Sequence, residues 1–262
     1  MFLRKRSSRS EKPKILEIRP GSRYKRETEM QRKALPGYFT IPRLENIPFL
    51  VHGFGTKHWT EKDFNRDDRL RTFRRISLRQ IHSDSIQFVE QFPDKQLEGD
   101  ALVTEVPGFL LMVKTADCLP VLIVDEAHRV VAAVHCGWRS TGRGLVQKVI
   151  RSLRTRYGCS SAALLVAMGP SIAGGCYEVG EKVLQFFVSE GLSGEFFRPI
   201  ASHRSRYLLD LKDANRDQLA RTGVKRENIF SVDNCTHCDE NLLSFRRDRN
   251  ETDRMLSFIG IS

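Results

Sequence analysis

The sequence predicts an α/β or α+β domain, because short apolar segments typical of strands alternate with longer amphipathic segments typical of helices. Three short runs rich in Val, Leu and Ile predict buried strands at residues 109–113, 120–124 and 129–134. Leu145, Val149 and Leu153 recur at four-residue spacing, so residues 145–157 are expected to form a helix with one apolar face. This alternation argues against an all-helical or all-β domain and leaves the order of the strands open.

The second half of the chain continues the alternation. Residues 163–168 predict a strand that runs into the turn GPSIAGG, and residues 178–188 predict a helix with one apolar side. Asp210 is positioned to cap a helix that begins at Leu211, because its carboxylate can accept hydrogen bonds from free amides of the first turn. Residues 229–232 predict a last strand before a cysteine-rich loop.

Length and composition are those of one large domain with a tail. The chain has 262 residues, of which 40% are hydrophobic, and this is sufficient for a substantial core. It contains no apolar run near the roughly 18 to 20 residues that span a bilayer, and its N-terminus lacks the apolar stretch of about 7 to 15 residues found in secretory signals. Six cysteines, several inside apolar segments, fit a reducing compartment better than a disulfide framework. We expect a cytoplasmic protein that does not enter a membrane.

The net charge of +11 is concentrated at the N-terminus. Residues 1–33 hold 12 Lys and Arg and 4 Asp and Glu, which gives +8, so the remaining residues contribute +3. A basic segment without hydrophobic periodicity predicts a disordered tail over residues 1–36. Such a tail is either solvated or makes weak, non-specific contact with nucleic acid by neutralising phosphates. A nucleic-acid-binding protein driven by this tail is one hypothesis for the chain, although no interleaved aromatic residues or recognised motif accompany the charge.

Cysteine and histidine residues at the ends of the predicted strands suggest a metal site. Cys118 and His135 lie at the ends of apolar segments, and zinc accepts sulfur and nitrogen ligands held on such rigid positions. Two ligands are too few, and His82 is the best-placed third because an alternating, strand-like pattern follows it. Three protein ligands leave a fourth position open for water or substrate, which is the arrangement of a catalytic zinc.

The same residues also have purely structural interpretations. His82 fits a buried, hydrogen-bonded histidine and Cys118 fits a buried apolar cysteine, so the spacing alone leaves metal ligation open for both. His135 has fewer structural uses, because it ends an apolar strand and is followed by a Gly-Trp-Arg turn.

The remaining cysteines form no recognisable metal motif. Cys235 and Cys238 make a single CxxC pair, which lacks the second pair that a structural zinc needs. Cys159 and Cys176 have no partner at motif spacing. The pattern therefore predicts a cysteine-bearing loop near the site and no second metal.

Seven segments in chain order carry a resemblance to a known family. They are QIHS, GDALVT, KTADCLPVLI, AAVHCGWRSTGRG, MGPSIAGGCYEVG, DLKDANRDQL and SFRRDRNETDR. Together they cover roughly residues 49–262, and they resemble the YfiH-like, laccase-domain family, also called multicopper polyphenol oxidoreductases. The resemblance implies an α+β fold of α/β/β/α layers, with a single catalytic domain over residues 37–262.

The resemblance also implies a metal and an activity. It implies a bound Zn²⁺, with Cu²⁺ as the other candidate, on His82, Cys118 and His135. It implies phosphorolysis of adenosine, inosine and methylthioadenosine, together with deamination of adenosine, so that purine nucleoside and phosphate are the expected substrates. Two alternatives attach to the same family: an amidase that edits a peptidoglycan precursor, and a copper-dependent polyphenol oxidase. The oxidase reading fits least, because several coppers need more histidines than the seven in this chain.

This sequence departs from the family pattern at several positions. The segment KHWTEKDFNRDDRLRTF, which follows HGFGT, is shorter than usual and replaces a Gly-Gly-x-Ser signature. Cys136, Ser140, Phe245 and Asp253 stand where alanine, glycine, tyrosine and glycine are usual. None of these changes removes a predicted metal ligand.

Two further residues are candidates for catalysis. The segment 137–144 lies between a strand and a helix, so its backbone amides can form an anion site with Arg139 as the phosphate ligand and Arg143 as a second partner or a surface ion pair. Asp117 adjoins Cys118 and is expected either to support the site and carry protons or simply to form a turn. Trp138 is expected to stack on a purine or to pack within the fold.

Overall fold

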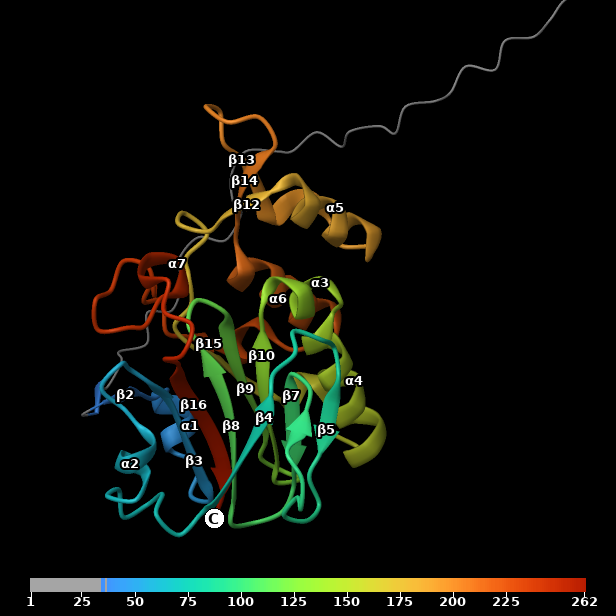
Figure 1. Ribbon diagram of the computed structural model, residues 1–262. Coiled ribbons are helices and arrows are strands. Elements are labelled where there is room, and N and C mark those ends of the chain that lie inside the picture. Colours follow the sequence, from blue (N-terminus) through green and yellow to red (C-terminus); the bar gives the residue numbers. More distant parts are fainter. Residues whose placement is uncertain (1–33, 36) are drawn as a thin grey trace, which may run out of the picture.

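Two β-sheets pack face to face in the computed structural model, which describes residues 34, 35 and 37–262 (Figure 1). From one edge to the other, the seven-stranded sheet consists of β1 (Ala34–Leu35), β2 (Tyr38–Phe39), β3 (Leu50–Gly55), β16 (Met255–Ile261), β8 (Phe109–Thr115), β4 (Arg74–Arg79) and β6 (Leu97–Glu98). The six-stranded sheet consists of β15 (Ile229–Ser231), β11 (Leu165–Met168), β9 (Leu119–Asp125), β10 (Val130–Cys136), β7 (Ala101–Thr104) and β5 (Ile86–Phe88).

The helices lie around the two large sheets, and some of them cover the outer faces. In chain order they are α1 (Pro42–Glu45), α2 (Glu61–Phe64), α3 (Trp138–Gly142), α4 (Leu145–Tyr157), α5 (Glu181–Ser189), α6 (Leu211–Arg221) and α7 (Phe245–Asp248). A small third sheet has the order β12 (Glu178–Gly180), β14 (Arg206–Leu209) and β13 (Phe197–Pro199). This sheet and α5 lie together at one end of the molecule, beyond the two large sheets (Figure 1).

The side chains of each central strand alternate between two buried faces. On β8, Leu111 and Val113 point between the sheets, whereas Leu110 and Met112 join an outer cluster with Trp59. Likewise, β9 and β10 face the other sheet with some residues and face α4 with the others. Strands that are buried on both faces read as continuous apolar runs, which is why the sequence shows no hydrophobic alternation there. The resulting α/β/β/α layering confirms the expected fold.

Most predicted elements are confirmed with small shifts in their ends. The helix α4 covers the predicted residues 145–157, and the Asp210 carboxylate caps α6 by accepting from the backbone N–H of Asp213 at 3.0 Å. The helix predicted over residues 178–188 is wrong in its first turn. There the chain forms β12, which pairs antiparallel with β14, and α5 starts only at Glu181 after the cap residue Gly180.

The predicted tail over residues 1–36 lies outside the described residues, apart from Ala34 and Leu35. These two residues pair with β2 at the edge of the seven-stranded sheet, so the sheet begins before the predicted boundary at residue 37. Among the described residues, no helix is both long enough and apolar enough to cross a membrane.

Candidate metal centre and active site

His82, Cys118 and His135 meet at one end of the six-stranded sheet. His82 follows β4, Cys118 lies in the short connection between β8 and β9, and His135 is on β10. Their possible ligand atoms all lie within 4.8 Å of one another, and the two imidazole rings are 5.0 Å apart between centroids at an angle of 77°. His135 is buried at 3% exposure, whereas the other two side chains are accessible. The structure therefore brings together the three residues that the sequence proposed as ligands and leaves one side of the group open.

Asp100 organises two of these three residues, although the sequence pattern gave it no role. It is fully buried, and its Oδ1 accepts a hydrogen bond from Nδ1 of His135 at 2.8 Å, which leaves Nε2 of that ring for a metal. The same carboxylate accepts hydrogen bonds from the backbone N–H groups of His82 at 3.1 Å and of Ser83 at 2.6 Å. A carboxylate that fixes the tautomer and direction of a ligand histidine is a common feature of zinc sites.

The backbone is strained at two positions of the centre. His82 has a φ of 55° and Asp117 a φ of 88°, both in the left-handed region that side chains other than glycine rarely adopt. Such conformations persist only where surrounding contacts enforce them, and they cluster at functional sites. The hydrogen bonds that Asp100 accepts from the backbone N–H groups of His82 and Ser83 enforce the conformation of His82.

The space among the donors suits a zinc ion. Gly137 lies directly against the group, since a Cβ atom there would approach Cys118 Sγ to 3.1 Å and His82 Cδ2 to 3.2 Å. Any side chain at this position would crowd the donors. One sulfur and two imidazole nitrogens are ligands that zinc accepts in tetrahedral geometry with a fourth position open.

Electrostatics favours a thiolate in this group. Burial raises the pKa of the Cys118 thiol, but the charge on His135 and hydrogen bonds from both histidines outweigh it and lower that pKa to about 6. Burial lowers the pKa of His135, but the Cys118 thiolate and the hydrogen bond to Asp100 raise it to about 9. Near neutral pH the group thus holds a thiolate beside an imidazolium, and a metal cation has to displace the His135 proton.

Asp117 is committed to structural contacts. Its Oδ1 accepts from the Thr236 hydroxyl at 2.6 Å, and its Oδ2 accepts from the backbone N–H of Arg246 at 2.6 Å. Its backbone carbonyl also accepts from the N–H of Ile172 at 2.9 Å. Asp117 thus joins the Cys118 connection to three distant segments of the chain.

Residues 63–262 match a family model described as multi-copper polyphenol oxidoreductase laccase. The chain belongs to this family. A purine nucleoside phosphorylase named YlmD, from Geobacillus stearothermophilus, is 35% identical over 196 residues, which are 71% of this chain and 71% of that protein. An adenosine deaminase named RL5, from an unknown prokaryotic organism, is 36% identical over 175 residues, which are 63% of this chain and 66% of that protein. The crystal structure of YlmD from Geobacillus stearothermophilus matches with a TM-score of 0.77 at 30% identity, covering 88% of this chain and 98% of that chain. The resemblance seen in the sequence is thereby confirmed.

In this laccase-domain protein, the segment 137–144 is not an open anion loop. Residues Trp138–Gly142 form the short helix α3, and the N–H groups of Thr141, Arg143 and Gly144 are bonded within the segment. These three amides lie in the later part of the segment, so they leave the first N–H groups of α3 without an acceptor inside the helix, and the anion site at its N-terminus stays a prediction. The side chain of Arg139 remains exposed and stacks on Trp138, with 4.0 Å from its Cζ to the ring centroid.

The neighbours of Arg139 have mainly structural contacts. Trp138 packs edge-on against Phe186 of α5 at 5.6 Å between centroids, as the packing interpretation predicted. Arg143 donates a hydrogen bond to the backbone carbonyl of His82 at 3.4 Å, so it contacts the segment that carries this proposed ligand.

Sequence reasoning missed four residues around the centre: Asp100, Tyr177, Thr236 and Arg246. Three of them lie in segments that carry the family resemblance, GDALVT, MGPSIAGGCYEVG and SFRRDRNETDR, and Thr236 lies inside the CxxC pair. Tyr177 is largely buried, and burial raises its pKa above the ordinary tyrosine value, with the nearby Cys118 thiolate acting in the same direction. The sequence motifs contain these residues, but the residues that they contact lie far away in the sequence, so their roles could not be predicted from it.

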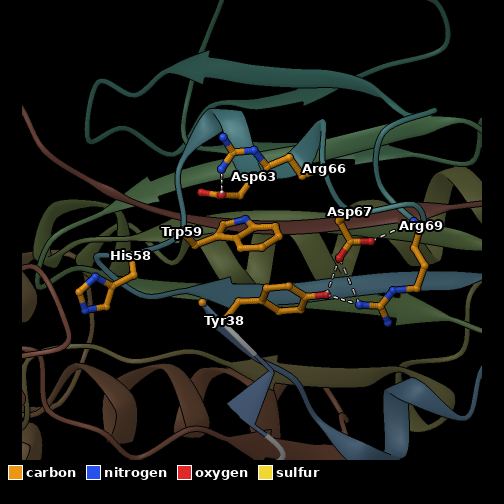
Figure 2. Close-up of a pocket in the computed structure, with 8 residues that line it drawn as sticks. Tyr38, His58, Trp59, Asp63, Arg66, Asp67 and Arg69 are labelled. Atoms are coloured by element: carbon orange, nitrogen blue, oxygen red, sulfur yellow. Dashed lines mark hydrogen bonds and ion pairs between the residues drawn. The ribbon is translucent and has the colours of Figure 1, made fainter.

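The segment that departs from the family pattern packs away from the centre. Its residues Trp59 and Phe64 lie against Phe258 of β16 on the outer face of the seven-stranded sheet, with 5.1 Å between the two phenylalanine rings. Beside them is a hollow of about 470 Å³ in which Arg69 contacts Tyr38 and Asp67 (Figure 2). None of the three proposed ligands lines this hollow.

Proposed function

We propose that the protein is a zinc-dependent purine nucleoside phosphorylase that also deaminates adenosine. Its substrates are adenosine, inosine and methylthioadenosine, with phosphate as the second substrate of phosphorolysis. The observation that carries the proposal is the cluster of His82, Cys118 and His135, in which only His135 is buried, in a chain whose relatives include proteins named for both activities.

The ligand residues define what the centre can do. His82, Cys118 and His135 would hold the zinc and leave one position for water or substrate. When bound, zinc lowers the pKa of water from ~15.7 to ~7 or polarises a phosphate or substrate oxygen, so one metal can serve both reactions. The Asp100 carboxylate keeps His135 aligned with its Nε2 toward the centre. Copper suits the same donors and is the second candidate metal.

Phosphorolysis needs an anion site and a proton source. A phosphate oxygen bonds to C1′ of the ribose, the bond from C1′ to the purine nitrogen breaks, and the base leaves with a proton. Arg139 is the proposed phosphate ligand, because its exposed guanidinium makes no ion pair with any carboxylate in the described part of the chain. Tyr177 is the proposed hydrogen-bond donor to the leaving purine, because its hydroxyl is protonated at neutral pH and lies close enough to the Cys118 group for their charges to interact.

Asp117 has a positioning role in this proposal. Both of its carboxylate oxygens already accept hydrogen bonds, from Thr236 in the loop after β15 and from Arg246 on α7, so they hold these two segments against the centre. A free proton carrier would need an oxygen that faces the substrate.

The test is an assay of the zinc-loaded protein with inosine plus phosphate and, separately, with adenosine alone. We expect hypoxanthine and ribose 1-phosphate from the first and inosine with ammonia from the second. Cys118→Ala should remove most of the zinc and both activities, because two imidazoles alone hold the ion weakly. Absence of both reactions in protein that carries zinc contradicts the proposal. Release of serine from a seryl peptidoglycan precursor, or polyphenol oxidation by copper-loaded protein, would then identify the alternative.

Arg139→Ala separates the two reactions. Loss of a charge-assisted hydrogen bond to phosphate, on the order of 1.5 to 3 kcal/mol, should raise the phosphate KM about 10- to 150-fold and leave deamination nearly unchanged. Arg154→Ala is the matched control, since Arg154 is exposed on α4. Equal loss of both reactions would mean that Arg139 supports the metal centre or the fold and does not bind phosphate.

A further inference from the structure

Three cysteines from two distant segments meet near the metal centre. Cys176 lies in the loop between β11 and β12, whereas Cys235 and Cys238 lie in the loop after β15. The three sulfur atoms all lie within 4.8 Å of one another, and those of Cys176 and Cys238 are 3.4 Å apart. The CxxC pair, which had no partner at motif spacing, thus gains a third sulfur through the fold.

The two loops are held together by backbone contacts that do not involve the sulfurs of Cys176 and Cys238. Ser171 and Cys235 form a parallel bridge, and the N–H of Thr236 donates to the carbonyl of Ser171 at 3.2 Å. The CxxC turn is closed by hydrogen bonds from the N–H groups of Cys238 and Asp239 to the carbonyl of Cys235. The sulfurs are therefore held near one another before any ligand binds, which is what a metal site requires.

The geometry and the local charge suit a soft cation. Thiolates bound at about 2.3 Å to one metal lie about 3.8 to 4.0 Å from each other, which is within the observed range of separations. The 3.4 Å separation is far longer than the roughly 2.0 Å of a disulfide. Arg198 donates to the carbonyl of Gly174, and Arg247, which is also paired with Asp248, donates to the carbonyl of Thr236, so a guanidinium group lies beside each loop.

We propose that Cys176, Cys235 and Cys238 form a second metal site that binds one soft d¹⁰ cation, Zn²⁺ or Cu(I), through three thiolates. Soft thiolate ligands select these ions, and the exposure of Cys238 gives them access from solvent. With Zn²⁺ a water completes the tetrahedron, whereas Cu(I) is satisfied by three sulfurs. The site goes beyond the proposed enzymatic function, because it shares no ligand with the His82, Cys118 and His135 centre.

The second site lies beside the loops that carry Tyr177 and Thr236, two residues around the first centre. Tyr177 follows Cys176, and Thr236, which follows Cys235, donates to Asp117 beside Cys118. A metal bound to the three cysteines therefore fixes the loops that carry Tyr177 and Thr236. Its role is to stabilise these loops and not to take part in the reaction.

The test uses full-length Cys118→Ala protein, which lacks the thiolate of the first centre. The protein is stripped of metal, kept reduced with a phosphine and titrated with Cd²⁺, whose thiolate complexes absorb in the ultraviolet. We expect saturation at one equivalent and protection of three thiols from a thiol reagent. Separate titrations of the cadmium form with Zn²⁺ and with Cu(I) identify which of the two ions binds more tightly.

Single serine variants provide the controls. In the Cys118→Ala background, Cys176→Ser and Cys238→Ser should each weaken Cd²⁺ binding by more than the roughly 10- to 100-fold that loss of a residue supporting a ligand costs. Cys159→Ser is the matched control, because Cys159 belongs to a different group of possible ligands, with Asp125 and His128, and an unchanged titration would assign the cadmium–thiolate absorption to the three cysteines.

Two outcomes overturn the proposal. One is the absence of a saturable cadmium–thiolate absorption in Cys118→Ala protein, and the other is an absorption that Cys176→Ser and Cys238→Ser leave intact. If Cys118→Ala protein does not fold, the same comparison is made in the wild-type background. There the wild-type protein should bind one more equivalent of Cd²⁺ than Cys238→Ser, and equal stoichiometries reject the second site.

Discussion

The carboxylate of Asp100 acts on two proposed ligands at once, because it accepts from the ring of His135 and from the backbone of His82. The first contact sets which imidazole nitrogen faces the metal. The second holds His82 in a left-handed conformation that it would otherwise avoid. A single buried side chain thus determines the geometry of a centre in which it is not itself a ligand.

Asp100→Asn should weaken zinc binding by about 10- to 100-fold, the usual cost of removing the carboxylate partner of a ligand histidine. The amide keeps the shape of the side chain but presents an N–H₂ group and loses the negative charge that aligns His135. Zinc affinity is measured by competition with a chromophoric chelator. Asp68→Asn, at a site that is 88% exposed, is the control and should bind zinc as the wild type does. Unchanged affinity in Asp100→Asn would contradict this role.

Zinc affinity should rise with pH between about 6 and about 9. The pKa of His135 is raised to about 9, so its proton competes with the metal below that pH, whereas the pKa of Cys118 is lowered to about 6, so a second proton competes only below that value. The logarithm of the association constant should therefore gain about one unit per pH unit in this window from His135 and flatten above it. Calorimetry in buffers of different ionisation enthalpy should count this released proton near pH 7.5. An affinity that falls as pH rises would contradict the thiolate–imidazolium pair.

At the scale of elements, the active-site region depends on connections between loops more than on the strands themselves. Asp117 joins the β8–β9 connection to the loops that follow β11 and β15 through its carboxylate and its backbone carbonyl. These loops are far apart in the sequence, and no helix or strand spans them. We therefore expect these segments to lose stability together when the contacts of Asp117 are removed.

Asp117→Ala should lower the free energy of unfolding by about 1 to 3 kcal/mol, because the buried Thr236 hydroxyl and the Arg246 N–H lose their acceptors. Thr236→Val, which removes only one of the two contacts at nearly constant volume, should cost less. Chemical denaturation of the metal-free proteins measures both values. A loss of activity in Asp117→Ala without any loss of stability would instead indicate direct participation in proton transfer.

At the scale of the whole molecule, most of the net positive charge lies in a different part of the sequence from the residues that form the two large sheets. Residues 1–33 carry +8 of the +11 net charge, so the rest of the chain carries +3. The two sheets and the connections between their strands, which supply every residue of the proposed metal centre, lie after this segment. The catalytic and electrostatic properties of the protein can therefore be tested independently.

A shortened protein that begins at Ala34 should bind zinc and turn over nucleoside as the full chain does. Full-length protein should be retained weakly on immobilised DNA, with retention that falls steeply as salt rises, because each neutralised phosphate releases counterions. The shortened protein should show little retention at any salt concentration. Loss of nucleoside turnover with zinc still bound would mean that the basic segment contributes to the active site.

The sequence by itself determined the features that depend on local pattern. The apolar runs of β8, β9 and β10 and the four-residue spacing in α4 follow from burial of one or two faces, so they are readable without the fold. The ordered family segments predicted the α/β/β/α layers and pointed to His82, Cys118 and His135 as ligands. The fold and family are confirmed, and the ligand roles stay predictions.

Only the tertiary structure decided which distant residues meet. The partners of Asp100 and Asp117 come from distant segments of the chain, and the third cysteine of the CxxC group lies about sixty positions earlier in the chain. The first turn of the predicted helix at residues 178–188 became β12 because pairing with β14 outweighed its local helical pattern. Such contacts depend on how the sheets and loops pack in space, so the spacing of residues along the chain does not predict them.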